Sequence, residues 1–280
     1  MNIALVGSSG FLSKRITEVF EKSANYQLYH IGRQSKDKLY LDLDEAEKFD
    51  YEILNEMDYV LFTAAISSPE LCEKDFDKAY KINVTGTQYF IERAIKKKCR
   101  VLFFSSDAVF GFTDKIVDEL SQTCADTAYG KMKKNIEDIF WGNPYFKSMR
   151  LSYVISKYDK YSQYLKACLE KKQIAEIYHP FYRNCIVDYE VIDLIKWLIE
   201  NWITFDSCVL NAGGFELISR VRIADEWNQI YKGKLIYNII EPEKIFFKYR
   251  PFRVQMQSLF LKNILKDYYS PFSEKMKKII

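Results

Sequence analysis

The sequence predicts a doubly wound α/β fold, in which helices cover both faces of a parallel sheet. Short apolar segments alternate with helical patterns as far as about residue 155 of the 280-residue chain. This alternation implies right-handed crossovers between parallel strands. Two of the segments, VLFTAA from Val60 and VLFF from Val101, are almost entirely apolar, which is typical of inner strands that are buried on both faces.

The individual elements follow in order from these patterns. We expect strands at residues 3–6, 26–31, 39–43, 59–64, 101–105 and 148–154. Residues 70–98 have a helical pattern, which we expect to break near Asn83 or Gly86 and to end in a run of lysines that complements the carbonyl end of a helix. Further helices are expected at residues 161–171, 191–202 and 219–230.

Two domains are expected, although no linker, repeat or biased segment separates them. The alternation loosens after about residue 155. We therefore assign the parallel sheet to residues 1–155. Residues 156–280 are expected to form mainly a smaller C-terminal lobe, with some segments returning to the first domain.

Composition and charge exclude several classes of protein. The chain is 48% hydrophobic and 28% charged, as expected of a folded globular protein and not of a disordered or fibrous one. The net charge of +3 is too small for a protein that would bind nucleic acid by neutralising many phosphates. A small anionic ligand remains compatible with it.

The sequence also argues against membrane and metal sites. Its longest strongly apolar stretch, residues 59–66, is far shorter than the roughly 18 residues of a membrane span. The N-terminus has neither the basic start nor the cleavage site of a signal peptide, so we expect a cytoplasmic protein. The six cysteines form no C-x-x-C pair and there are only two histidines, so we expect no metal site.

A glycine-containing turn directly follows the first expected strand. Gly7 and Gly10 frame Ser8 and Ser9, and a helical pattern begins behind them. Such a turn lets the backbone approach a pyrophosphate, whose charge then faces the amide groups at the helix N-terminus. Ser13 stands where the usual spacing has a third glycine, and we expect it to be tolerated because serine is small.

The residues after the second and third strands favour NADP as the ligand. Residues 30–35 (HIGRQS) have no acid at the position where an NAD-preferring fold would hold the ribose hydroxyls, and Arg33 stands there instead. A guanidinium can pair bidentately with a 2′-phosphate. Arg33 as a solvated loop cation remains the alternative. Asp42, followed by Leu43, can either accept a hydrogen bond from the adenine amino group or cap the next helix.

A further group of polar residues follows later strands. Ser106 and Asp107 come at the end of the fifth strand, and Tyr129 and Lys133 lie four residues apart at the start of a helix. That spacing places both side chains on one helical face, where the ammonium is expected to lower the phenol pKa toward a working value. A phenol and a neighbouring serine hydroxyl can exchange a proton with, and hold, the oxygen of a carbonyl or alcohol.

In this order the motifs resemble those of the extended short-chain dehydrogenase/reductases, which have a Rossmann-like fold, and the resemblance covers essentially the whole chain. It rests on Gly7, Gly10, the Ala64-Ala65 strand end, Asn83 in the sequence INVTGT, Ser106, Tyr129 and Lys133. The resemblance implies that Ser106, Tyr129 and Lys133 form the catalytic set and that Asn83 supports the site. The alternative that Asn83 is a polar residue that interrupts the helix and has no role in ligand binding stays open.

Within this superfamily the sequence is most similar to the dTDP-4-dehydrorhamnose reductase group. Ser106–Gly111 (SDAVFG) resembles the T-D-x-V-F strand end of that group, and Arg250-Pro251 resembles its R-P motif. Asn211–Gly214 and Arg150-Leu151-Ser152 resemble two of its strands. The segment Arg253–Met256 departs from the pattern, which affects any transfer of substrate contacts.

The resemblance implies an NADP-dependent reductase of a nucleotide-activated 4-keto-6-deoxy sugar. Its partner would be a nucleoside diphosphate sugar, dTDP-linked in that group. Ala108 stands where a dehydratase would carry a second acid and an epimerase a cysteine, which favours reduction. An epimerase and a non-catalytic NADP-binding scaffold remain the alternatives. The oligomeric state is open, with a homodimer as one option.

The resulting site assignments divide into three groups. For catalysis we assign Ser106, Tyr129 and Lys133. For the cofactor we assign Gly7, Ser9, Gly10, Phe11, Leu12, Arg33, Asp42, Leu43, Ala64, Ala65, Asn83, Tyr129 and Lys133. For the substrate we assign Ser67, Ser106, Asp107 and Arg250, while the roles of Arg183 and His179 stay open and His179 is expected to be an ordinary surface or core residue.

Overall fold

The computed structural model describes residues 1–34 and 39–280 of the chain. These residues divide into two compact units, each assembled from separate stretches of sequence. The first unit comprises Met1–Gly111, Thr123–Arg150 and Leu198–Leu210, and the second comprises Phe112–Gln122, Leu151–Trp197 and Asn211–Ile280.

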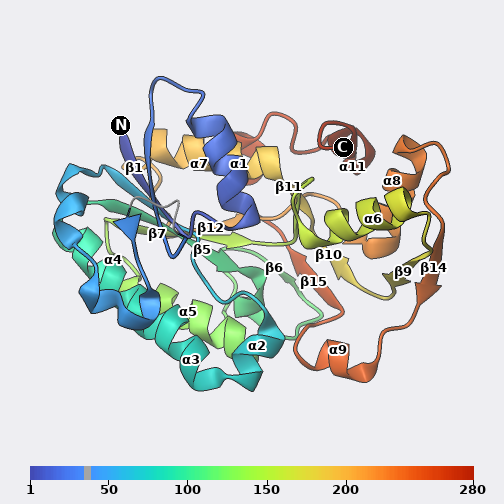
Figure 1. The fold of residues 1–280 in the computed structure, drawn as a ribbon, viewed down its shortest axis with the longest axis horizontal. Helices are drawn as coiled ribbons and strands as arrows, with labels where there is room; N and C mark the ends of the chain where they lie inside the picture. The colour runs from blue at the N-terminus through green and yellow to red at the C-terminus, as the bar shows by residue number, and fades with distance from the viewer. Residues whose placement is uncertain (35–38) are drawn as a thin grey trace. The chain divides into compact units, whose positions relative to one another are not determined.

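A seven-stranded sheet organises the first unit (Figure 1). Its strands are β1 (Asn2–Val6), β2 (Gln27–Gly32), β3 (Leu39–Tyr40), β4 (Tyr59–Phe62), β5 (Arg100–Ser106), β7 (Phe146–Leu151) and β12 (Val209–Ala212), in the order β12-β7-β5-β4-β1-β2-β3. β1 pairs in parallel with β2 and with β4, so the order reverses between them. The doubly wound parallel sheet predicted from the sequence is confirmed, and its reversal point is where such sheets bind ligands.

The helical segments of the first unit connect these strands. They are α1 (Phe11–Phe20), η1 (Leu43–Lys48), η2 (Tyr51–Glu56), α2 (Pro69–Lys74), α3 (Phe76–Tyr80), η3 (Lys81–Gly86), α4 (Thr87–Lys96), η4 (Asp107–Phe110) and α5 (Ala128–Phe140). The break expected near Asn83 or Gly86 is confirmed, because η3 is a π-helical turn between α3 and α4. A Cβ atom at Gly86 would lie 1.9 Å from the carbonyl oxygen of Leu43, so only glycine permits this close approach.

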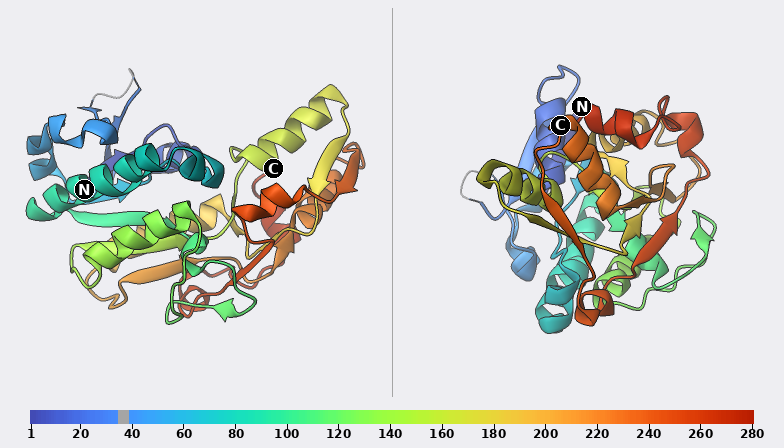
Figure 2. Two further views of the ribbon diagram at one scale, coloured as in Figure 1. Left: turned by 90° about the horizontal axis from the view of Figure 1, so that it is seen from below. Right: turned by 90° about the vertical axis from the view of Figure 1, so that its right-hand side faces the viewer.

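The core of this unit explains the sequence patterns. In β1, Ala4 and Val6 face one cluster of buried side chains, which also contains Phe90 of α4 and Met132 and Ile136 of α5. Helices α4 and α5 lie on the same side of the sheet (Figure 2). The continuously apolar strands β4 and β5 are buried along nearly their whole length, as predicted for inner strands.

The second unit contains smaller sheets. A four-stranded sheet has the order β13-β10-β15-β6, formed by β13 (Ile218–Ser219), β10 (Tyr182–Arg183), β15 (Arg253–Met256) and β6 (Ile116–Val117). Two pairs of strands are separate: β8 (Val154–Ile155) with β11 (Ile186–Val187), and β9 (Ala175–Tyr178) with β14 (Tyr237–Ile240).

The helices of the second unit are α6 (Lys160–Lys171), α7 (Asp188–Glu200), α8 (Arg220–Ile230), α9 (Lys244–Lys248), α10 (Leu261–Ile264) and α11 (Phe272–Lys277), of which α7 runs into the first unit. Three of them, α6, α7 and α8, lie within three residues of the ranges expected from the sequence, whereas α9, α10 and α11 were not expected. Leu165 of α6, Trp227 of α8 and Ile177 of β9 belong to one buried cluster. Within residues 1–34 and 39–280, no helix has the length and apolarity to cross a membrane.

Two strands differ from the expectation. The segment expected at 39–43 pairs only at Leu39–Tyr40, because Asp42 caps the short helix that follows. The segment expected at 148–154 divides into β7, in the large sheet, and β8, which pairs with β11. An apolar run does not show by itself where a chain leaves one sheet for another.

Candidate functional site

The glycine turn brings the backbone of β1 very close to the end of β4. Gly7 has a φ of 89°, and a Cβ atom there would lie 2.7 Å from the backbone N and Cα atoms of Ala64. Helix α1 begins directly behind Gly10, and no side chain caps its N-terminus. The first turn of α1 therefore presents backbone amide groups next to Gly7, a position where only glycine fits. This arrangement is typical of sites that bind phosphate groups.

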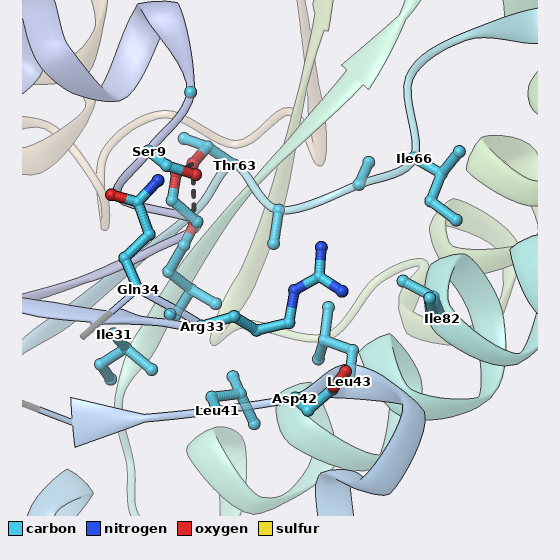
Figure 3. Close-up of a pocket in the computed structure, with 16 residues that line it drawn as sticks. Ser9, Ile31, Arg33, Gln34, Leu41, Asp42, Leu43, Thr63, Ile66 and Ile82 are labelled. Atoms are coloured by element: carbon cyan, nitrogen blue, oxygen red, sulfur yellow. Dashed lines mark hydrogen bonds between the residues drawn. The ribbon is translucent and has the colours of Figure 1, made fainter. Parts of the chain in front are cut away.

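A cavity of ≈ 260 Å³ lies at the carboxyl ends of β1, β2 and β4. The residues around it include eight that the sequence assigned to the cofactor, namely Gly7, Ser9, Gly10, Arg33, Asp42, Leu43, Ala64 and Ala65 (Figure 3). Others, among them Gln34, Thr63, Ile66 and Ile82, were not assigned. They could have been found only from the pairing of β1 with β2 and β4, because each lies at or near the end of one of these strands or in η3.

Arg33 is the cationic group that the sequence placed at this cavity. Figure 3 shows its side chain reaching across the cavity toward Leu43 and Asp42. Asp42 Oδ1 accepts a hydrogen bond from the backbone N–H of Asp44 at 3.1 Å, so it caps η1 and also lines the cavity. Both roles considered for Asp42 are thus compatible.

Phe11 and Leu12 differ from the other residues assigned to the cofactor. They form the first turn of α1, where Phe11 is 37% exposed and Leu12 is buried, and neither side chain lines the cavity. Only their backbone amides remain candidates for phosphate contact.

Ser106, Tyr129 and Lys133 meet where β5 ends and α5 begins. The Ser106 hydroxyl forms a hydrogen bond with the Tyr129 hydroxyl and also accepts one from the backbone N–H of Ala108 at 3.2 Å. Lys133 is buried, and its Nζ donates to the carbonyl oxygen of Phe104 at 2.7 Å. The Lys133 Nζ lies 5.9 Å from the centre of the Tyr129 ring, so the spacing of four residues places the two side chains together as predicted.

The electrostatics of this group differ from the expectation. Desolvation raises the pKa of Tyr129, and the negative charge of Asp107 raises it further, against the hydrogen bond from Ser106. Desolvation lowers the pKa of Lys133 to about 8, although Glu137 opposes this. The expected lowering of the phenol pKa is therefore wrong for this structure, because desolvation and the negative charge of Asp107 raise the pKa.

Asn83 supports the strand end beside these residues. Its Oδ1 accepts from the backbone N–H of Ile66 at 2.8 Å, and its Nδ2 donates to the Ile66 carbonyl at 3.0 Å. Asn83 thereby ties η3 to the segment that leaves β4. Asn83 therefore belongs to the interruption of the helix and also holds one wall of the cavity, because Ile66 and Ile82 line that cavity.

Two carboxylates that the sequence reasoning missed hold the helix that carries Tyr129. Glu73 accepts from the backbone N–H of Ala128 at 2.8 Å. Glu137 forms a buried ion pair with Arg150, in which Nη2 and Oε2 are 2.7 Å apart. Glu137 could have been noticed, because it continues the spacing from Tyr129 through Lys133 along one helical face. Glu73 had no comparable signal.

The residues assigned to the substrate are divided between the two units. Ser67, exposed, and Asp107, whose Oδ1 accepts from the Ser106 hydroxyl at 3.2 Å, belong to the first unit. Arg250 belongs to the second, with its guanidinium carbon 4.9 Å from the Phe246 ring centre. Arg183 donates to the carbonyl oxygens of Tyr182 at 2.7 Å and Pro251 at 2.9 Å, and thus holds the Arg250-Pro251 segment.

His179 and the acidic residues give no sign of a metal centre. The His179 ring packs edge-on against Tyr182, with 5.6 Å between ring centres. Among the residues that the structure describes, no group of three or more His, Cys, Asp or Glu side chains could hold a metal ion.

Comparisons with known proteins agree with the fold and the motifs. The RmlD substrate binding domain family matches residues 1–179. No match is found among curated protein sequences.

Several solved structures are similar over nearly their whole length. A dTDP-4-dehydrorhamnose reductase from Clostridium acetobutylicum is 18% identical, with a TM-score of 0.81 over 100% of this chain and 98% of the other. The dTDP-4-dehydrorhamnose reductase from Bacillus anthracis, in complex with NADP, is 17% identical, with a TM-score of 0.81 over 99% and 98%. The UDP-glucuronic acid 4-epimerase from Bacillus cereus, in complex with UDP-glucuronic acid and NAD, is 18% identical, with a TM-score of 0.80 over 100% and 98%.

These likenesses show the fold, and the family match covers more than half of the chain. The chain therefore belongs to the RmlD substrate binding domain family and, with it, to the extended short-chain dehydrogenase/reductases, a superfamily of NAD(P)H-dependent oxidoreductases, as its motifs predicted.

Proposed function

We propose that this protein is an NADPH-dependent reductase of a nucleotide-activated 4-ketosugar. The observation that carries the proposal is the meeting of Ser106, Tyr129 and Lys133 in the same unit as a cavity that contains Arg33. The match to the RmlD family supports a nucleoside diphosphate sugar as the substrate, with a 4-keto-6-deoxy sugar as its reactive part.

The cavity residues fit a dinucleotide. Gly7 lets the turn lie against the backbone of Ala64, where no Cβ atom fits, and the uncapped N-terminus of α1 offers amide groups to a pyrophosphate. Arg33 would pair with a 2′-phosphate, and none of the described residues that line the cavity at the end of β2 is acidic. When bound, NADPH supplies the hydride for carbonyl reduction.

The remaining chemistry belongs to side chains of this chain. Tyr129 donates the proton to the carbonyl oxygen, and its raised pKa keeps the proton on the phenol at neutral pH. Ser106, already bonded to the Tyr129 hydroxyl, holds the same oxygen. Lys133 keeps a positive charge beside the phenol and stabilises the phenolate that remains after proton transfer.

An epimerase is the second candidate, because the structure of a UDP-glucuronic acid 4-epimerase is as similar to this chain as those of the reductases. Ala108 follows Asp107 where epimerases that act beside a ketone carry a second reactive group, which argues against an epimerase of that kind. The cofactor pocket also favours NADPH through Arg33, whereas the epimerase structure holds NAD.

Replacement of Tyr129 by Phe tests the catalytic assignment. The change removes one hydroxyl, so NADPH binding is expected to persist while turnover falls by about 10² or more, the scale of general acid catalysis. Turnover that stays at the wild-type rate would contradict the assignment.

Turnover in D2O separates the two candidate functions. A reductase consumes one NADPH for each ketosugar and, after correction for spontaneous exchange, introduces no solvent deuterium at the carbons that flank the carbonyl. Enzyme-dependent deuterium at C3 or C5, or turnover without net NADPH oxidation, would instead favour the epimerase. Mass spectrometry of the product gives the answer.

A further inference from the structure

Two hydroxyl groups, of which that of Ser13 is buried and that of Thr63 half-buried, join the glycine turn, helix α1 and the end of strand β4. Ser13 Oγ and Thr63 Oγ1 are 2.8 Å apart. Ser13 Oγ is 2.9 Å from the carbonyl oxygen of Gly7, and Thr63 Oγ1 is 2.7 Å from that of Val6. Ser13 occupies the position where the usual glycine pattern has its third glycine, so this contact is available only because the chain departs from that pattern.

The number of protons defines how the two hydroxyls are connected. Each hydroxyl donates one hydrogen bond, and the short distance between the two oxygens requires a proton between them. Either Ser13 donates to Thr63 and Thr63 to Val6, or Thr63 donates to Ser13 and Ser13 to Gly7. In the first arrangement Ser13, on α1, is linked to the Val6 carbonyl through Thr63. In the second, Thr63, behind β4, is linked to the Gly7 carbonyl through Ser13. Both arrangements are chains of two hydrogen bonds that need both hydroxyls.

The turn packs against the neighbouring strand without room for a side chain at Gly7. Gly7 has a positive φ and lies so close to β4 that a Cβ atom would be 2.9 Å from Thr63 Oγ1. Its carbonyl also accepts from the backbone N–H of Gly10 at 3.2 Å, within the turn itself. The Thr63 hydroxyl, which is 2.8 Å from Ser13 Oγ and 3.3 Å from the Gly7 carbonyl oxygen, ties this turn to the segment that leaves β4.

We propose that Ser13 and Thr63 are positioning residues that fix the glycine turn in the conformation that binds the pyrophosphate of the cofactor. The inference rests on the proposed function in that NADPH is the ligand of the cavity. A turn that is already ordered loses less conformational freedom on binding, which improves affinity without a direct contact to the ligand.

Affinity for two ligands separates this role from a general loss of stability. NADPH contacts the turn through its pyrophosphate, whereas adenosine 2′-monophosphate has the adenine and the 2′-phosphate but no pyrophosphate. Ser13→Ala and Thr63→Val are each expected to lower the affinity for NADPH by about fivefold, which is the scale of one neutral hydrogen bond. Binding of adenosine 2′-monophosphate should stay within twofold of the wild type. Isothermal titration measures both, and no turnover is needed.

Further variants test the connection between the two hydroxyls. The double variant is expected to bind NADPH about as weakly as either single variant, because both changes break the same chain of hydrogen bonds. Thr63→Ser keeps a hydroxyl and should restore binding, while Ser13→Gly, which recreates the usual third glycine, should behave like Ser13→Ala. Thr17→Val, one turn further along α1, is the matched control and should have no effect.

The outcomes distinguish failure of this inference from failure of the proposed function. Wild-type affinity in both single variants, additive losses in the double variant, or equal weakening of both ligands would overturn the positioning role. Failure of the wild-type protein to bind NADPH would overturn the cofactor assignment together with the inference.

Discussion

Replacement of Gly130 tests how closely helix α5, which carries Tyr129 and Lys133, must approach the end of β5. Gly130 lies between Tyr129 and Lys133 in the first turn of α5, and a Cβ atom there would be 2.4 Å from the carbonyl oxygen of Ala108. Contacts below 3.0 Å are essentially never made by real Cβ atoms. The opposing atom belongs to the backbone, so no side-chain rotation can relieve the contact.

Replacement of Gly130 by Ala should therefore move α5 and the Ser106–Ala108 segment apart by about 0.6 Å or more. The movement separates the Tyr129 hydroxyl from Ser106, and a misplacement of about 1 Å can reduce turnover by about 10²-fold. We expect turnover to fall by about 10- to 100-fold. Affinity for NADPH should change by no more than about twofold, because Gly130 does not line the cofactor cavity.

The assay is NADPH oxidation in the presence of the ketosugar, with cofactor affinity measured separately by thermal shift. Alanine raises helix propensity by about 1 kcal/mol over glycine, so a loss of turnover would not come from a weaker helix. Lys131→Ala, at the next and exposed position of α5, is the control and should retain activity. Wild-type turnover in Gly130→Ala would refute the argument that this contact sets the geometry of the site.

Three further changes test charges in the first unit. Arg33→Ala should weaken the binding of NADPH by about 1.5–3 kcal/mol in titrations and leave the binding of NADH nearly unchanged, because only NADPH carries the 2′-phosphate. Equal affinity of the wild-type protein for both cofactors would contradict this role of Arg33. Lys133→Met should raise the free energy of unfolding, measured in urea, by about 1–2 kcal/mol at pH 7. The reason is that the buried ammonium, whose pKa is lowered to about 8, destabilises the fold while it is charged. The same change should abolish turnover, because Lys133 belongs to the proposed catalytic set. The gain should shrink from pH 8 toward pH 10.5, where the unfolded chain also loses this proton, and a gain independent of pH would contradict the assignment. Glu137→Gln should lower the free energy of unfolding by about 3–5 kcal/mol because it leaves Arg150 buried without its carboxylate, whereas Asp138→Asn, at an exposed position of the same helix, should change it by less than about 1 kcal/mol.

Those parts of the site that depend on local spacing could be predicted from the sequence. The glycine turn needs only a strand, two glycines and a helix in succession, and the structure places Gly7 where a Cβ atom cannot fit. Tyr129 and Lys133 lie on one helical face because the period of the helix requires it. Asn83 marked the helix interruption because it preceded a glycine in an otherwise regular pattern.

The parts that depend on contacts between distant segments could not be predicted. Glu73 and Ala128 are 55 residues apart and meet only because α2 packs beside α5. The contact of Thr63 with Ser13 depends on the pairing of β1 with β4, which the local sequence does not show. The shortening of the third strand likewise followed from the side chain of Asp42 turning back onto its own backbone.

The pKa of Tyr129 shows why position on a helix does not settle chemistry. The spacing to Lys133 correctly predicted proximity, but burial acts on both groups, raising the phenol pKa and lowering that of the ammonium. At pH 7 these shifts leave the phenol protonated and the ammonium still mostly charged. That combination suits a proton donor, because the phenol keeps its proton until a carbonyl oxygen accepts it and the lysine charge then stabilises the phenolate.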